Sequence, residues 1–220
     1  MKTVVVVGAN RGIGLEFTRQ LSENSDNRVY ALCRKSSPQL SELPVKVIEG
    51  CEVRDSSSLD RACLQIPEPI DWLIHVSGIL RADSLTSPDL EGLEEQLSVN
   101  SVGPMRSVMA FLPKLKEGSK IALLTSRMGS LADNSSGGYY GYRMSKAALN
   151  MMGVSLALDL KPQGISVLLL HPGFVRTDMT GNQGDLDTQS SVKKMLVLIQ
   201  DKGLTETGRF WHCSGEELPW

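Results

Sequence analysis

The chain has 220 residues, of which 41% are hydrophobic and 22% are charged, a composition typical of a soluble globular protein. This length suits one domain with a sizeable core and leaves little room for a second. The formal net charge of −2 argues against a nucleic-acid-binding protein, which needs a surplus of basic residues.

The cysteines and the amino-terminal segment argue against further classes. Cys33, Cys51, Cys63 and Cys213 are scattered and form no C-x-x-C pair, so we expect no disulfide framework, no metal site and a reducing, cytoplasmic location. The apolar run Val4–Val7 is too short for a signal peptide and leads directly into a glycine motif. No apolar stretch approaches the ~20 residues that span a bilayer, so we expect no membrane partner.

Strand-like and helix-like segments alternate along the whole chain. The predicted strands are Thr3–Val7, Arg28–Cys33, Val45–Glu49, Asp71–Val76, Lys120–Thr125 and Ile165–Leu170, with Arg209–Cys213 as a short edge strand. The predicted helices are Gly12–Glu23, Ser56–Gln65, Asp89–Leu115, Tyr139–Leu160 and Ser190–Asp201. This alternation predicts one doubly wound α/β domain over residues 1–220, a Rossmann fold with a parallel sheet and helices on both faces.

The segment Gly8–Gly14 joins the first predicted strand to the first helix. Its glycines allow a sharp turn and let a pyrophosphate approach the amides at the helix N-terminus, where the dipole favours negative charge. A bare tight turn is the alternative, but the position between a four-valine strand and an amphipathic helix favours a dinucleotide site. The residues expected to contact the dinucleotide are Gly8, Asn10, Arg11, Gly12, Ile13 and Gly14.

The end of the second predicted strand indicates which cofactor is used. An acidic residue there would accept hydrogen bonds from the ribose hydroxyls of NAD, whereas this chain has Arg34 and Lys35. Arg34 and Arg11 are suited to clamp a ribose 2′-phosphate, because a guanidinium makes bidentate contacts. Solvated surface charge is the alternative. We expect NADPH rather than NADH.

Tyr142 and Lys146 are four residues apart, on one face of a predicted helix. A tyrosine with a pKa of about 10 is a poor acid–base catalyst at neutral pH. A nearby ammonium and an oxidised nicotinamide would lower that pKa. A surface pair is the alternative, since this spacing is common.

Two further polar residues lie where they can assist. Ser126 ends the fifth predicted strand, where its hydroxyl can bind a substrate carbonyl, and Ser130 is a rival in the same loop. Asn100 precedes Pro104 by four residues within the long predicted helix. Pro104 has no amide hydrogen for the Asn100 carbonyl, so we expect a kink there.

These motifs, in this order, resemble the short-chain dehydrogenase/reductase superfamily. The G-x-x-x-G-x-G spacing, Ser126, the Tyr142–Lys146 pair and the Pro172–Thr177 segment all match its pattern. The resemblance implies a proton donor in Tyr142, helped by Lys146 and Ser126, and a water held by Asn100. It also implies cofactor contacts from Glu52, Val53, Gly78, Tyr142, Lys146, Pro172, Gly173, Val175 and Thr177. The Gly141–Met151 run and the terminal Glu217–Trp220 resemble the C-factor (C-signal) and Sniffer-like carbonyl reductase branch.

The chain departs from the superfamily pattern in two places. His75-Val76-Ser77-Gly78 stands where an Asn-Asn-Ala-Gly segment is usual, which puts substrate class and full activity in doubt. His75 and His171 are expected to pack in the core rather than to carry protons. The separation between Ser126 and Tyr142 is longer than usual, and we expect a loop around Asp133–Gly138 to absorb the difference.

The resulting hypothesis is an NADPH-dependent reductase that converts a ketone, aldehyde or quinone to an alcohol. The alternative is an NADP-binding signalling or regulatory protein with vestigial turnover. The helix Tyr139–Leu160 is apolar on nearly all sides, so we expect a homodimer through it and through Asp89–Leu115. The natural substrate is not readable from the sequence, although Leu80–Thr86, Gly129–Gly138 and Met179–Asp187 are expected to line its pocket.

Overall fold

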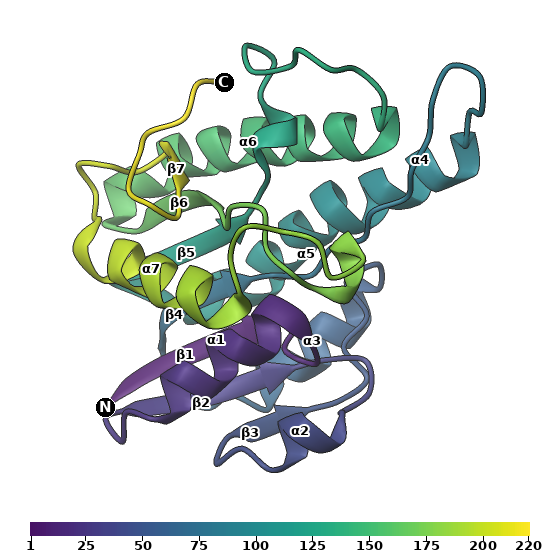
Figure 1. The fold of residues 1–220 in the computed structure, drawn as a ribbon. Coiled ribbons are helices and arrows are strands. Elements are labelled where there is room, and N and C mark those ends of the chain that lie inside the picture. The colour runs from purple at the N-terminus through teal and green to yellow at the C-terminus, as the bar shows by residue number, and fades with distance from the viewer.

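Seven parallel strands form a single sheet in the computed structural model, which describes residues 1–220 (Figure 1). The strands are β1 (Lys2–Val7), β2 (Asn27–Leu32), β3 (Lys46–Ile48), β4 (Ile70–His75), β5 (Leu115–Leu124), β6 (Ser166–His171) and β7 (Phe210–His212). Their spatial order is β3-β2-β1-β4-β5-β6-β7, and every neighbouring pair is parallel. The predicted doubly wound fold is confirmed, including its edge strand. The strand order reverses between β1 and β4, which opens a crevice at the carboxyl ends of the strands.

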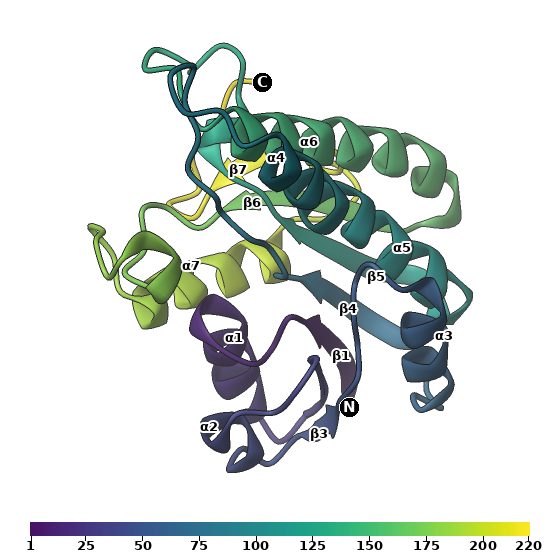
Figure 2. The ribbon, with the colours of Figure 1, turned by 90° about the vertical axis from the view of Figure 1, so that its right-hand side faces the viewer.

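Helices cover both faces of the sheet (Figures 1 and 2). They are α1 (Gly12–Ser22), α2 (Pro38–Ser41), α3 (Ser56–Leu64), α4 (Leu90–Leu97), α5 (Gly103–Phe111), α6 (Tyr140–Leu160) and α7 (Thr188–Asp201). Side chains alternate along β1: Val4 and Val6 pack with residues of α1, α2 and α7, whereas Val5 and Val7 pack with residues of α3, α5 and α6. Two hydrophobic cores therefore lie on opposite faces of the sheet. None of the helices has both the length and the apolar character of a membrane-spanning segment.

The long helix predicted over Asp89–Leu115 is interrupted. Helices α4 and α5 are joined by a π-helical turn, Ser98–Val102, in which the Gly103 amide donates to the Ser98 carbonyl five residues back. The expected disturbance before Pro104 is thus a π-helical turn. The prediction is wrong at the far end, because α5 stops at Phe111 before a short 3₁₀ turn that contains Pro113, and β5 begins at Leu115.

Local capping fixes several element boundaries. The Asp187 side chain caps α7 by accepting the Ser190 amide, so the helix begins at Thr188, two residues earlier than predicted. Helix α2, which was not predicted, is four residues long and is capped by Ser37. So short a helix shows no hydrophobic periodicity. The four cysteines are free and buried.

Candidate functional site

Two adjacent cavities open at the carboxyl ends of the strands, and Tyr142 lines both of them. The larger has a volume of about 630 Å³ and the smaller about 400 Å³. The larger cavity collects most of the predicted cofactor contacts: Gly8, Asn10, Arg11, Gly12, Ile13, Gly14, Arg34, Glu52, Val53, Gly78, Tyr142, Lys146, Pro172 and Thr177. The smaller is lined by Ser126, Tyr142, Gly173 and Val175. Asn100 is fully buried and lines neither cavity, and the rival Ser130 also lines neither.

The glycine loop has the geometry of a phosphate cradle. Gly8 has a φ of +93°, and a Cβ there would lie 2.5 Å from Ser77 Oγ. Gly12 has a φ of +52°, which also favours glycine. Helix α1 begins at Gly12 without a side-chain cap, so its first amides remain available to an anion. The side-chain oxygen of Asn10 is buried without a partner.

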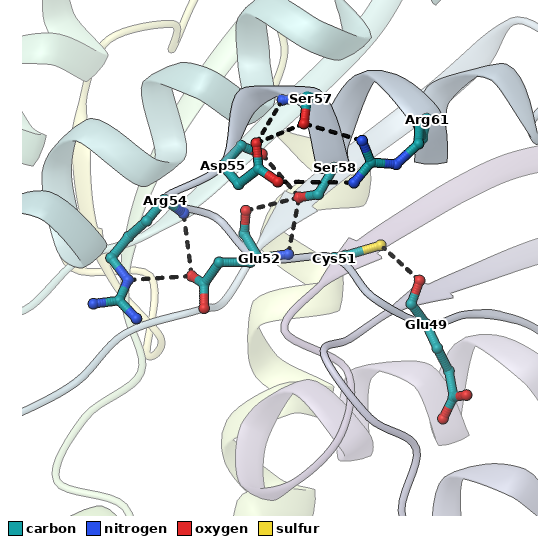
Figure 3. A network of polar contacts seen from close by, with 8 residues as sticks. All are labelled: Glu49, Cys51, Glu52, Arg54, Asp55, Ser57, Ser58 and Arg61. Carbon is teal, nitrogen blue, oxygen red and sulfur yellow. Dashed lines mark hydrogen bonds and ion pairs between the residues drawn. The ribbon is translucent and has the colours of Figure 1, made fainter.

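The far end of the larger cavity carries the residues expected to distinguish NADPH from NADH. Arg34, Lys35 and Arg54 line it, and 72% of the Arg34 side chain is exposed. Glu52 pairs with both arginines. Its carboxylate lies 3.8 Å from Arg34 Nη1 and 3.4 Å from Arg54 Nε, the second of which is drawn in Figure 3. Burial opposes ionisation of Glu52, but hydrogen bonds from Arg54 and the charges of both arginines hold its pKa below the usual range. Glu52 was expected to contact the cofactor, but its ion pairs with Arg34 and Arg54 were not predicted.

Ser126, Tyr142 and Lys146 converge where the two cavities meet. Burial raises the pKa of Tyr142 to about 12, although a hydrogen bond with the Ser126 side chain acts in the opposite direction. Burial lowers the pKa of Lys146 to about 8. Lys146 Nζ donates to the Leu124 carbonyl at 2.9 Å and lies 5.7 Å from the centroid of the Tyr142 ring. The protein alone therefore holds Tyr142 in its protonated form at neutral pH.

The start of α6, which carries Tyr142 and Lys146, is fixed by a distant segment. The helix has no side-chain cap of its own and follows Tyr139, which has a φ of +51°. Asp83 replaces the cap: its carboxylate accepts the amides of Tyr140 and Gly141, the latter at 2.9 Å. The sequence reasoning missed Asp83, because a cap that is 57 residues away leaves no local signal.

The strand end that carries Ser126 is also tied to α6. Thr125 Oγ1 donates to Asn150 Oδ1 at 2.6 Å, and Asn150 Nδ2 donates to the Gly129 carbonyl at 3.3 Å. A Cβ on Gly129 would lie 2.7 Å from the Lys146 backbone, so only glycine permits this approach. Residues 130–139, between the turn that follows Ser126 and the start of α6, form an irregular loop.

Asn100 links the π-helical turn to α6 and to the segment after β4. Its side-chain amide donates to the Ile79 carbonyl at 2.8 Å and to Ser145 Oγ at 3.0 Å, and its oxygen accepts the Ile79 amide at 2.8 Å. A Cβ on Gly78 would lie 3.3 Å from Asn100 Oδ1 and 3.7 Å from Lys146 Nζ. The asparagine thus lies close to the lysine.

His75 is the last residue of β4 and His171 is the last residue of β6, with β5 between the two strands. Both ring nitrogens of His75 are buried without partners, and burial lowers its pKa to about 3, with a contribution from the charge of Lys146. Burial likewise lowers the pKa of His171 to about 3. His75 is in the core, whereas His171 lines the smaller cavity. Both imidazoles are neutral at physiological pH.

Comparison with known proteins gives matches across the whole chain. A family model described as short chain dehydrogenase matches residues 2–187. The chain is 37% identical over 227 residues to 1-hydroxy-2-glutathionyl-2-methyl-3-butene dehydrogenase of Rhodococcus sp. (strain AD45), covering 100% of both proteins. It is 45% identical over 157 residues to C-signal of Myxococcus xanthus, covering 69% of this chain and 93% of that protein.

A solved structure has nearly the same fold. The NADPH-bound carbonyl reductase from chicken fatty liver superimposes with a TM-score of 0.92 at 29% sequence identity, covering 100% of this chain and 99% of that one.

Proposed function

Since the chain belongs to the short chain dehydrogenase family, we propose that it is an NADPH-dependent oxidoreductase that reduces the carbonyl group of a small molecule to an alcohol. The observation that carries the proposal is the convergence of Ser126, Tyr142 and Lys146 at the junction of the two cavities. The likeness to an NADPH-bound carbonyl reductase supports the same cofactor and direction.

The residues of the larger cavity fit NADPH. The uncapped amides of α1 and the cradle formed by Gly8 and Gly12 suit the pyrophosphate. Arg11 and Arg34 suit the 2′-phosphate, since Arg11 has no ion-pair partner and Arg34 has only Glu52 at 3.8 Å. When bound, NADPH supplies a hydride to the carbonyl carbon.

Tyr142 supplies the proton that the carbonyl oxygen needs. Its hydroxyl is protonated at neutral pH because burial raises its pKa to about 12, so it is a donor in the reductive direction. Ser126, with its side chain beside the Tyr142 hydroxyl, binds the same carbonyl oxygen and stabilises the charge that develops there. In the reverse direction the phenolate form of Tyr142 would receive the proton of the alcohol while Ser126 holds the same oxygen, which matches the named activity of the Rhodococcus relative as a dehydrogenase.

Lys146 and Asn100 support the proton donor. The lysine is buried, and its pKa of about 8 keeps a protonated fraction at neutral pH. That ammonium stabilises the phenolate left after proton transfer. Asn100 lies behind the lysine and holds the Ile79 backbone and Ser145 in place, which positions the lysine and the proton route to solvent.

The experiment is NADPH consumption with a panel of ketones, aldehydes and quinones, using the wild type beside Tyr142→Phe. We expect turnover that falls by about 10²-fold or more in the variant, the usual contribution of a general acid, while its affinity for NADPH is retained. Turnover that survives in Tyr142→Phe would remove the proposed proton donor.

The similarity to C-signal supports a second candidate, an NADP-binding signalling or regulatory protein. In that case NADPH binds tightly, and no carbonyl is reduced above the Tyr142→Phe background. Retention of Ser126, Tyr142 and Lys146 favours the reductase, because a binding module has no use for a buried proton donor. The buried free cysteines fit a reducing compartment, and we propose a cytoplasmic location.

We also propose a homodimer through α5 and α6. In the single chain α6 exposes one apolar face, on which Met144, Met151 and Leu158 recur every seven residues and are 49–69% exposed. A matching exposed row lies along α5 and the turns that flank it, formed by Val102, Met105, Met109 and Leu112. Apolar rows at this spacing are suited to helix–helix packing against a second copy.

A further inference from the structure

The smaller cavity contains an arginine whose charge no acid in the chain compensates. Arg143 follows Tyr142 on α6 and lines the cavity together with Tyr142 and Ser126. Its Nε donates to the Gly138 carbonyl at 3.0 Å, and its Nη2 donates to Ser136 Oγ at 2.8 Å and to one further backbone carbonyl at 3.2 Å. These acceptors are all neutral. Nη1 has no protein partner, so two N–H donors remain for a ligand.

The other cation of this cavity is already paired. Arg127 Nε lies 3.1 Å from Asp133 Oδ2, and its Nη2 lies 3.7 Å from Glu216 Oε2. Asp133 is the only acid among the residues that line the cavity, beside Arg127 and Arg143. Two arginines and one aspartate leave a formal charge of +1 on the lining. That charge is located on Arg143, next to the proposed proton donor.

The remaining lining gives the shape of the expected ligand. Leu80, Met128, Phe174 and Met179 form apolar walls, and Phe174 and Met179 are 50% and 43% exposed at the mouth. A neutral ligand would leave the guanidinium without a counter-charge, whereas an anionic group is able to accept both free N–H donors. The ligand that satisfies the whole cavity is an apolar molecule with a carbonyl at one position and an anionic group at another.

We propose that the substrate is a carbonyl compound that also bears a carboxylate, and that Arg143 binds the carboxylate while Tyr142 and Ser126 hold the carbonyl oxygen. This inference rests on the proposed reductase function. A purely structural role for Arg143, in holding Ser136–Gly138, is the competing explanation. That role predicts equal effects on charged and uncharged substrates, so paired substrates separate the two.

The test compares kcat/KM for 3-formylbenzoate and 4-formylbenzoate with kcat/KM for their methyl esters, with NADPH saturating. We expect the wild type to prefer at least one acid over its ester, and Arg143→Gln to lower that acid-to-ester ratio about 10-fold or more, as for a charge-assisted hydrogen bond. Arg143→Lys retains part of the preference. The matched control is Arg176→Gln, because Arg176 also lacks an ion pair, bonds only the Gly184 carbonyl and lines neither cavity.

The outcomes separate the inference from the function on which it rests. The inference is wrong if the wild type reduces the esters without preferring either acid, or if Arg143→Gln leaves the acid-to-ester ratio unchanged. Either result is still compatible with the proposed reductase function. No turnover of any of the four aldehydes overturns both. If Arg143→Gln does not fold, the acid-to-ester ratio of the wild type is measured at increasing salt concentrations instead. The inference predicts that this ratio decreases, because added salt weakens a partly exposed ion pair. A ratio that does not fall then overturns the inference.

Discussion

Replacing His75 with leucine tests how a fully buried imidazole without partners is tolerated. Both nitrogens of His75 are buried and unbonded, and its side chain is 2% exposed between the strands that contain Val7 and Leu123. A buried polar group without a partner costs about 1–3 kcal/mol. We therefore expect His75→Leu, a substitution of similar volume, to raise the free energy of unfolding by about that amount at pH 7.5.

The same substitution has a predicted effect on acid stability. The pKa of His75 is about 3 in the folded protein, against 6.5 as its ordinary value. Between these values the unfolded chain binds a proton that the folded protein does not, so the free energy of unfolding decreases as the pH falls. One such group contributes up to about 1.4 kcal/mol per pH unit, or about 2.7 kcal/mol in all between pH 7.5 and 4.5. In His75→Leu this contribution is lost, and the pH dependence becomes shallower by that amount.

The assay is urea unfolding followed by circular dichroism from pH 4.5 to 7.5, for the wild type, His75→Leu and a His212→Gln control. His212 is partly exposed and bonds Ser214, so its replacement should change the pH dependence less. A His75→Leu protein that is less stable at every pH, with the wild-type slope, would refute the reasoning. It would mean that the imidazole is hydrogen-bonded in the folded protein.

Three further predictions follow from other parts of the molecule. Asp83→Ala removes the cap of α6, so it should lower the free energy of unfolding by about 1 kcal/mol in urea and should change kcat more than the KM for NADPH in steady-state kinetics. Asp83→Asn keeps one acceptor and should restore part of both the stability and kcat. An unchanged kcat in Asp83→Ala would contradict the positioning role. Arg34→Ala should lower the ratio of kcat/KM for NADPH to that for NADH by about 10-fold, whereas Arg61→Ala, outside the cavity, should not; equal ratios in the two variants would remove Arg34 from the phosphate site. Met151→Asp, on the exposed row of α6, should convert a dimer to a monomer in sedimentation at micromolar concentration, and a wild-type monomer would rule out the proposed interface.

The fold was predictable because its signals are local or periodic. The valine run of β1, the glycine turn and the alternation of strands and helices each depend on neighbouring residues, and together they define the sheet. The errors lie where a short-range rule fails. Helix α2 has too few residues to show periodicity, and α5 ends earlier than its apolar pattern because Pro113 follows.

The candidate site was predictable in its motifs but not in its supports. All the motif residues except the buried Asn100 line two adjacent cavities. Asp83 and Glu52 were not given their observed contacts, because each depends on a partner brought close only by the tertiary fold. The burial of Tyr142 was not predicted, although it raises the pKa of this tyrosine and outweighs the hydrogen bond with Ser126. Desolvation depends on packing, which a motif does not specify.

The most direct test of the central claim is the transfer of deuterium from NADPH labelled at C4 of the nicotinamide to a reduced aldehyde or ketone. Each of the two C4-deuterated isomers is incubated with the wild type and with Tyr142→Phe, and the alcohol is analysed by mass spectrometry. We predict that one isomer alone delivers one deuterium to the carbinol carbon with the wild type, and that Tyr142→Phe forms almost no labelled alcohol. Tight NADPH binding by the wild type without any labelled alcohol would contradict the account and favour the regulatory protein.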